Sequence, residues 1–210
     1  LSINEIIIGL GGKMPIKQLN KERFRQQELN KSYISIIRSF QNFIDKLIAI
    51  IDLTTKRILV DRNLNSEQDL NDYLQQMEDK SIQSVSKDRK LNFPKKLDYF
   101  EIEEITKEIL TGYSGLRNNL EHHKDIASKD TIFKSFVLTL YVNDIEVTSL
   151  PYNALKGDSL VMKNIVTERL IKQGTTVQIS ETEIYNIAYT LGKVICLNII
   201  QKTNDKLLAK

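Results

Sequence analysis

An apolar stripe with helical spacing, between residues 28 and 52, constrains the fold of this chain more than any other feature. Apolar side chains recur there at steps of three and four residues, which is the spacing of one face of an α-helix. They are Tyr33, Ile36, Ile37, Phe40, Ile44, Leu47, Ile48 and Ile51. A helix with one long apolar face must bury that face against other elements. The stripe therefore predicts a mainly α-helical domain built around this helix.

Two later stripes predict two more long helices. We expect one from about residue 98 to about residue 125, and another that starts at the capping box of Ser180 and Glu183 and runs to the C-terminus. Their apolar residues are Ile102, Ile105, Ile109, Tyr113, Leu116 and Leu120, then Ile184, Ile187, Ala188, Leu191, Ile195 and Ile199. The expected shared core contains Ile37, Phe40, Ile44, Leu47, Ile105, Ile109, Leu116, Leu120, Ile187, Leu191 and Ile195.

The segments between these helices carry other local signals. Ser66 predicts the start of a short helix, and a polar, mobile loop is expected over residues 79–95. Residues 136–148 contain two β-prone runs around an Asn-Asp turn pair, which predicts a small β-hairpin insertion. Residues 160–170 predict a further helix of about three turns, which Gly174 would end.

The length of 210 residues suits one compact domain. We predict a polar N-terminal lead-in over residues 1–27 and one helical domain over residues 28–210. No internal repeat and no linker rich in glycine and serine divides the second part.

Composition and charge exclude several classes of protein. The chain has 30 Lys and Arg against 27 Asp and Glu, and the net charge of +3 is too small to argue by itself for nucleic-acid or membrane binding. The single cysteine, Cys196, excludes disulfide frameworks and cysteine zinc sites. We expect Cys196 to be a buried structural thiol, and we expect no metal and no cofactor. No apolar run approaches the ~20 residues of a membrane span, and the chain start does not resemble a signal peptide. A cytoplasmic protein without a membrane partner is therefore expected.

Two further segments carry weak signals of a binding site. The glycines of residues 9–12 precede Lys13, but their spacing is too short for a phosphate-binding loop and Met14 stands where Ser or Thr is needed, so that interpretation is rejected. Residues 87–96 are rich in Lys and Arg, which could contact RNA. A run of charged residues is more often a solvated loop, and we favour that interpretation.

The densest polar cluster lies near the end of the second predicted helix. It reads Arg-Asn-Asn-Leu-Glu-His-His-Lys from Arg117 and contains both histidines of the chain, His122 and His123. At ~100° per residue, Arg117 and His122 lie ~140° apart with Glu121 between them, on one broad polar flank. His123 turns back toward the apolar stripe, so we expect it to be half-buried.

Two interpretations of this flank are open. It is either the solvated C-terminal end of a helix, where the dipole favours a cation, or a set of groups for proton transfer and phosphate stabilisation. An imidazole exchanges protons near neutral pH, and a guanidinium group matches the geometry of phosphate oxygens. A helix flank does not close a site alone, so a second copy of the chain would complete it.

The run Leu-Arg-Asn-x-x-Glu-His, from Leu116 to His122, resembles the motif of the HEPN superfamily, the higher eukaryotes and prokaryotes nucleotide-binding domains. The form with the additional Asn and Glu is similar to one bacterial branch. In architecture the resemblance extends from about Glu28 to the C-terminus. It implies an antiparallel helical bundle that dimerises along the motif helices and, in many members, a metal-independent endoribonuclease that serves as a toxin or phage-defence effector.

The resemblance also implies roles for the motif residues. Arg117 would bind the scissile phosphate and stabilise its transition state, and His122 would act as general acid or base. Asn118 would orient this pair, and Glu121 would hold Arg117 or His122 in place. The implied partners are an RNA substrate, a second copy in a homodimer and an antitoxin protein. The alternative is a non-catalytic HEPN-like module for dimerisation or interaction.

Overall fold

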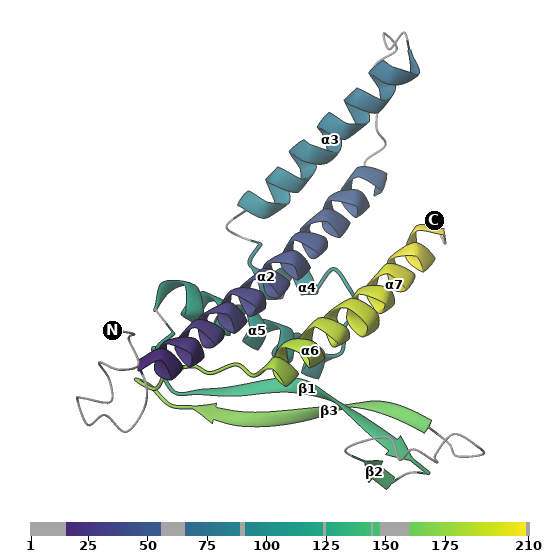
Figure 1. Ribbon diagram of the computed structural model, residues 1–210. Coiled ribbons are helices and arrows are strands. Elements are labelled where there is room, and N and C mark those ends of the chain that lie inside the picture. Colours follow the sequence, from purple (N-terminus) through teal and green to yellow (C-terminus); the bar gives the residue numbers. More distant parts are fainter. Residues whose placement is uncertain are drawn as a thin grey trace.

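The computed structural model describes residues 16–55, 66–88, 91–123, 125–143, 145–147 and 160–208. The described part is mainly helical and contains one three-stranded antiparallel sheet. Figure 1 shows the long helices on one side of a long, twisted β-ribbon. The prediction of a mainly α fold with a small β insertion is therefore confirmed at this level.

The first long helix, α2 (Ile16–Thr55), is confirmed and extends further toward the N-terminus than its apolar stripe. Its buried residues include Tyr33, Ile37, Phe40, Ile44 and Ile48. Residue 28, the expected end of the lead-in, lies inside this helix, and residues 1–15 are outside the described part of the chain. The helix therefore crosses the predicted boundary without interruption.

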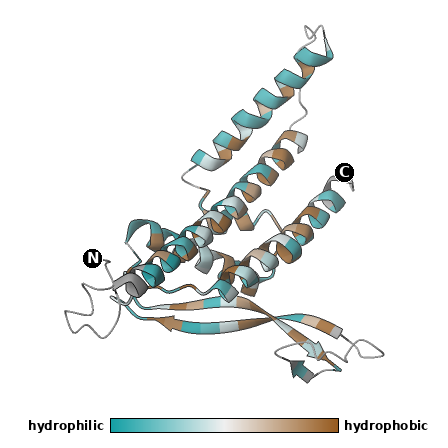
Figure 2. Ribbon diagram, in the orientation of Figure 1, coloured by the Kyte–Doolittle hydropathy of each residue, from teal (hydrophilic) through white to brown (hydrophobic). Residues whose placement is uncertain are grey.

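Helix α3 (Glu67–Lys87) lies alongside α2 (Figure 1). Ser66 caps it, as predicted, by accepting a hydrogen bond from the Asp69 N–H. The loop expected over residues 79–95 is wrong, because helix continues to Lys87 and the short helix α4 (Phe93–Leu97) follows. Figure 2 shows that α3 is largely hydrophilic, which is why its sequence resembles a loop. Packing against α2 holds it in the helical state.

Helix α5 (Glu104–His122) is the second long helix, and it begins later than predicted because α4 and a turn precede it. Its face toward the core contains Ile109, Leu110, Tyr113, Leu116 and Leu120. Ile105 was expected in the core but is 39% exposed. It lies in the first turn, at the edge of the buried face, so the core prediction is wrong for this residue.

The sheet has the strand order β2-β1-β3. Strand β1 (Thr131–Val142) turns through Asn143, at a φ of 49°, into β2 (Ile145–Val147), so the predicted hairpin is confirmed. Strand β3 (Leu160–Ile171) pairs with the whole of β1, from Thr131 opposite Ile171 to Val142 opposite Leu160. Figure 1 shows these two strands as one long ribbon.

The helix predicted over residues 160–170 is therefore wrong. The apolar positions fit a helical face, but β-branched Ile165, Val166 and Thr167 favour a strand and β1 supplies the partner. Gly174, with a φ of 76°, lies in the turn after β3 and donates its N–H to the Ala127 carbonyl.

The third long helix is confirmed as three consecutive segments: α6 (Glu181–Tyr189), the π-helical segment η1 (Thr190–Cys196) and α7 (Leu197–Leu208). The capping box of Ser180 and Glu183 is present. Of the expected core, all residues are buried except Ile105 and the half-buried Leu47. None of the described helices is long and apolar enough to cross a membrane.

Candidate functional site

Arg117 lies on the flank of α5 that faces α2, and its side chain is 19% exposed. Its Nη1 donates to Gln41 Oε1 of α2 at 2.9 Å, and its Nη2 donates to Asn118 Oδ1 at 2.5 Å. The remaining nitrogen, Nε, lies 3.7 Å from Glu121 Oε2. Protein groups therefore hold the guanidinium of Arg117 on three sides.

Glu121 connects the motif to α2 through a second arginine. Its side chain is 14% exposed, and its Oε1 lies 2.9 Å from Nε of Arg38, whose side chain is 60% exposed. One carboxylate is thus paired with two guanidinium groups, Arg117 on its own helix and Arg38 on the neighbouring helix. Such a network is worth more than an isolated surface pair because Glu121 is mostly removed from water.

Gln41 orients Arg117 from the opposite side. Its Nε2 donates to the hydroxyl of buried Ser114 at 2.8 Å, which leaves Gln41 Oε1 to accept from Arg117. Sequence reasoning missed Gln41 and Arg38, since their contribution depends on how α2 packs against α5. The available signal was their position beside the apolar stripe of α2, next to Ile37 and Phe40.

The other polar residues of the motif have separate roles. Asn118 is exposed and accepts from Arg117, whereas Asn119 donates to the Ile126 carbonyl and accepts from the Ser128 N–H. Asn119 thereby ties the end of α5 to the following turn. This contact lies in the connection from α5 to β1, and the sequence analysis did not predict it.

The two histidines lie at the end of α5. His122 is the last residue of the helix and is exposed, and its side chain forms no hydrogen bond or ion pair with the described residues. His123 is the C-cap and is also exposed, so the expectation of a half-buried residue is wrong. The apolar stripe of α5 ends at Leu120, so the core does not reach the cap.

The structure thus brings Arg117, Asn118 and Glu121 into one network and leaves His122 exposed beside it. Two atoms of the network, Arg117 Nε and Glu121 Oε1, are buried and have charged neighbours but no hydrogen bond of good geometry. Arg169 of β3 also has two such atoms, Nε and Nη2, so buried atoms of this kind do not by themselves single out the motif as a site.

The motif flank is not part of the small apolar cavity beside α5. That cavity, of about 190 Å³, lies between α5, β1 and the segment after β3, and its walls include Gly112, Leu116, Phe133 and Val177. Neither Arg117 nor His122 lines it. Any substrate of the motif would therefore approach an open helix flank.

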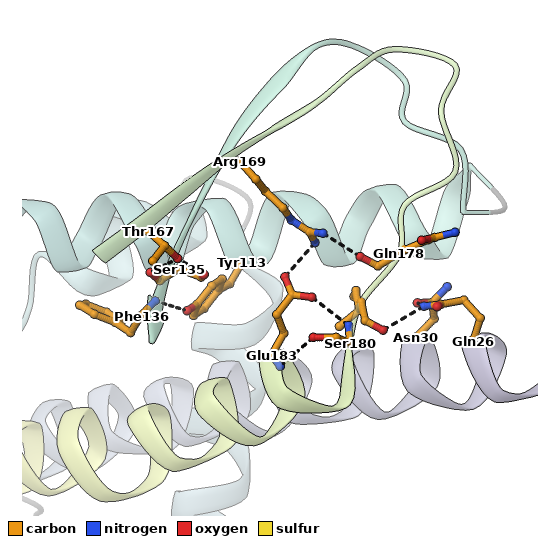
Figure 3. Close-up of polar contacts among 11 residues, drawn as sticks. Gln26, Asn30, Tyr113, Ser135, Phe136, Thr167, Arg169, Gln178, Ser180 and Glu183 are labelled. Atoms are coloured by element: carbon orange, nitrogen blue, oxygen red, sulfur yellow. Dashed lines mark hydrogen bonds and ion pairs between the residues drawn. The ribbon is translucent and has the colours of Figure 1, made fainter. Parts of the chain in front are cut away.

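A second arginine cluster, missed by sequence reasoning, joins β3 to the start of α6 (Figure 3). Arg169 Nη1 donates to the Gln178 carbonyl at 2.9 Å, and Nη2 lies 3.0 Å from Glu183 Oε1. The guanidinium also lies over the ring of Phe133, 5.3 Å from its centre. Glu183 is at the same time the acidic residue of the capping box, so this cluster positions α6.

Two tyrosines extend this region into the core. Tyr33 donates its hydroxyl to the Tyr113 carbonyl at 2.9 Å, and the Tyr113 hydroxyl accepts from the Phe136 N–H at 3.2 Å (Figure 3 shows the second bond). Burial raises the pKa of Tyr113 to about 12 and raises that of Tyr33 well above its usual value. Both hydroxyls are therefore protonated at neutral pH and act as structural groups.

The remaining candidates from the sequence have structural contacts or lie outside the described residues. Cys196 is half-buried, and burial raises the pKa of its thiol to about 11, which disfavours the reactive thiolate. In the basic segment 87–96, buried Lys96 pairs with Asp45 at 2.6 Å, so its charge is neutralised within the fold. The rejected phosphate loop of residues 9–13 is outside the described part.

Within the described ranges, no group of three or more His, Cys, Asp and Glu side chains could hold a metal ion. Comparison of the chain with protein-family models, with curated proteins and with solved structures finds no match. The candidate function therefore rests on the motif residues and their contacts.

Proposed function

We propose that this chain is a metal-independent endoribonuclease of the HEPN type. The observation that carries the proposal is the arrangement of the motif: Arg117 is held by Asn118 and Glu121, and His122 follows them as an exposed residue at the end of α5. This arrangement provides a fixed guanidinium and an accessible imidazole near the same end of α5. Together these are the groups that phosphodiester transfer requires.

The proposed reaction is an attack of the ribose 2′-hydroxyl on the neighbouring phosphorus. His122 accepts the 2′-hydroxyl proton as the 2′-oxygen forms its bond to phosphorus, and the bond from phosphorus to the 5′-oxygen breaks. The departing 5′-oxygen takes a proton from a general acid, for which the imidazolium of a second copy is the candidate. Arg117 stabilises the negative charge that develops on the phosphate oxygens. The products are a 2′,3′-cyclic phosphate and a 5′-hydroxyl.

The open helix flank supports a homodimer as the active form. Arg117 and His122 lie ~140° apart around α5, so one copy presents them in diverging directions. Two copies related by a two-fold axis would place the histidine of each beside the arginine of the other. Light scattering at micromolar concentration is expected to show a dimer, and a stable monomer would contradict this part of the proposal.

A role as a toxin or phage-defence effector follows from the HEPN assignment, with an antitoxin protein as its partner. Expression of the chain is then expected to arrest bacterial growth, and the His122→Ala variant is expected to permit it. Growth arrest by both proteins would contradict a role that depends on RNA cleavage.

One observation favours a second candidate, a non-catalytic interaction module. Every nitrogen of the Arg117 side chain that could bind a phosphate already faces a protein group, and the network joins α2 to α5. In that case the motif stabilises the helix pair or a dimer interface. Substitution of Arg117 would then change stability or dimerisation and would affect no reaction.

Incubation of the purified protein with total RNA in EDTA separates these candidates. The wild type is expected to cleave RNA and His122→Ala is expected not to. His123→Ala is a matched control, because this adjacent histidine is also exposed at the helix end, and it is expected to cleave at the wild-type rate. Equal cleavage by wild type and His122→Ala, or none by the wild type, would overturn the nuclease proposal in favour of the interaction module.

A further inference from the structure

Resting on the proposed function, we infer that Arg38 of α2 is a phosphate-binding residue of the same site, which contacts the RNA backbone while Arg117 acts on the reacting phosphate. Arg38 lies outside the motif and on a different helix. Its link to the motif is its ion pair with Glu121, at 2.9 Å. Arg38 and Arg117 differ in the exposure of their side chains and in the hydrogen bonds of their terminal nitrogens.

Arg38 has the more available guanidinium. Its side chain is 60% exposed, and its closest contact with Glu121 is through Nε. Among the described residues, no hydrogen bond involves its terminal nitrogens. The Arg117 side chain is 19% exposed, and both of its terminal nitrogens donate to side-chain oxygens. A phosphate can therefore bind the terminal edge of Arg38 without breaking an existing hydrogen bond.

The charge balance around Glu121 also favours an anion. Two guanidinium groups face one carboxylate, so the network has a surplus positive charge. Elsewhere in the fold, pairs such as Arg25 with Glu181 and buried Lys96 with Asp45 contain one charge of each sign. A backbone phosphate beside Arg38 would neutralise the surplus, and Glu121 would hold the guanidinium in position for it.

Arg25 provides a matched control for this inference. It lies on the same helix, its side chain is 66% exposed, and it forms an ion pair of 2.7 Å with Glu181. Arg25 therefore shares with Arg38 its residue type, helix, exposure and kind of partner. It contacts the start of α6 rather than the motif, so its loss should not change RNA binding.

The test measures equilibrium binding of a fluorescent single-stranded RNA at several salt concentrations, in a His122→Ala background that leaves the RNA intact. Adding Arg38→Ala is expected to weaken binding about tenfold and to lower the dependence of log affinity on log salt by about 0.7. Adding Arg38→Lys is expected to keep the salt dependence and to lose at most about threefold in affinity, because the charge remains. Adding Arg25→Ala is expected to change neither quantity.

Binding and cleavage can fail separately in this design. If the wild type cleaves RNA but Arg38→Ala binds it with unchanged affinity and salt dependence, the assignment of Arg38 is overturned and the nuclease proposal stands. If the wild type does not cleave but Arg38→Ala weakens binding as expected, the nuclease proposal fails and Arg38 remains a phosphate-binding residue. If no variant binds RNA, the assignment of Arg38 is overturned, and cleavage by the wild type alone decides the nuclease proposal. Thermal melting of Arg38→Ala and Arg38→Lys shows whether a loss of RNA binding reflects unfolding. If Arg25→Ala weakens RNA binding as much as a folded Arg38→Lys variant does, the assignment of Arg38 is also overturned.

Discussion

The molecule has two arginine clusters, one around Arg117 and one around Arg169, and they differ in whether they include exposed polar groups. Arg169 contacts a backbone carbonyl and a carboxylate that caps α6, as Figure 3 shows. Its guanidinium also lies over the ring of Phe133, so its contacts complete the fold. The Arg117 cluster consists of side chains from α2 and α5, and it includes the exposed guanidinium of Arg38 and borders exposed His122. The comparison teaches that a paired arginine alone does not mark a site. The Arg117 cluster differs in its surplus charge and its accessible polar groups, and the proposed site rests on these two features.

Replacement of Arg117 is expected to give the largest effect on activity. Arg117→Lys should lower the rate of RNA cleavage by about 10²- to 10³-fold, because an ammonium group cannot contact Gln41, Asn118 and a phosphate at once. Single-turnover cleavage rates measure this effect. Arg169→Lys is the comparison variant and should retain the wild-type rate per folded molecule. Equal losses in both variants would mean that the two clusters do not differ in function.

Truncation of a core side chain shows how large a purely structural effect on the free energy of unfolding is. Ile109 is fully buried on α5, and Ile109→Ala is expected to cost about 2–5 kcal/mol in the free energy of unfolding. Urea denaturation measures this cost. A value below 1 kcal/mol would contradict the packing of α5 against α2.

Arg169 should affect stability without affecting chemistry. Arg169→Ala removes the partner of Glu183 and the cation over Phe133, so a loss of about 1–2 kcal/mol is expected. Thermal or urea unfolding measures it, alongside RNA cleavage at a temperature where the variant is folded. An unchanged stability would show that this cluster does not position α6.

The capping box sharpens the same point with a smaller effect. Ser180→Ala removes the acceptor for the Glu183 N–H, and a loss of about 1 kcal/mol in unfolding free energy is expected. RNA cleavage should be unchanged. If Ser180→Ala lost RNA cleavage while its free energy of unfolding stayed unchanged, the prediction would be contradicted, because the start of α6 would then take part in the reaction.

His123 is expected to give the smallest effect. Since its side chain is exposed at the C-cap, His123→Ala should change the unfolding free energy by less than about 0.5 kcal/mol. Urea unfolding provides the measurement. A cost near that of Ile109→Ala would restore the original expectation that His123 packs against the core.

Local signals explain which parts of the fold were predictable. The stripes of α2, α5 and the C-terminal helix follow a 3.6-residue period, and the capping box of Ser180 lies within four consecutive residues. Strand β3 was missed because its pairing with β1 joins distant segments. The start of α3 at Ser66 was predicted, but its extension from residue 79 to Lys87 was missed because α2 stabilises a hydrophilic helix there. In both cases tertiary contacts decide between states that the sequence leaves close in energy.

Only the part of the candidate site that lies on α5 was predictable from the sequence. Arg117, Asn118 and Glu121 are close in sequence on one helix, so their joint position follows from helical spacing. Arg38 and Gln41 belong to α2, and only the packing of two helices brings them to the motif. The exposure of His123 depends on where α5 ends, and a boundary shift of one or two residues changes it.

The ends of the RNA fragments made in EDTA test most directly whether the motif flank is a site of RNA cleavage. The wild type is expected to leave 2′,3′-cyclic phosphate and 5′-hydroxyl ends, and His122→Ala is expected to leave RNA intact while unfolding at the same temperature as the wild type. Fragments with 3′-hydroxyl ends, cleavage that EDTA abolishes, or equal cleavage by His122→Ala would contradict the proposed site.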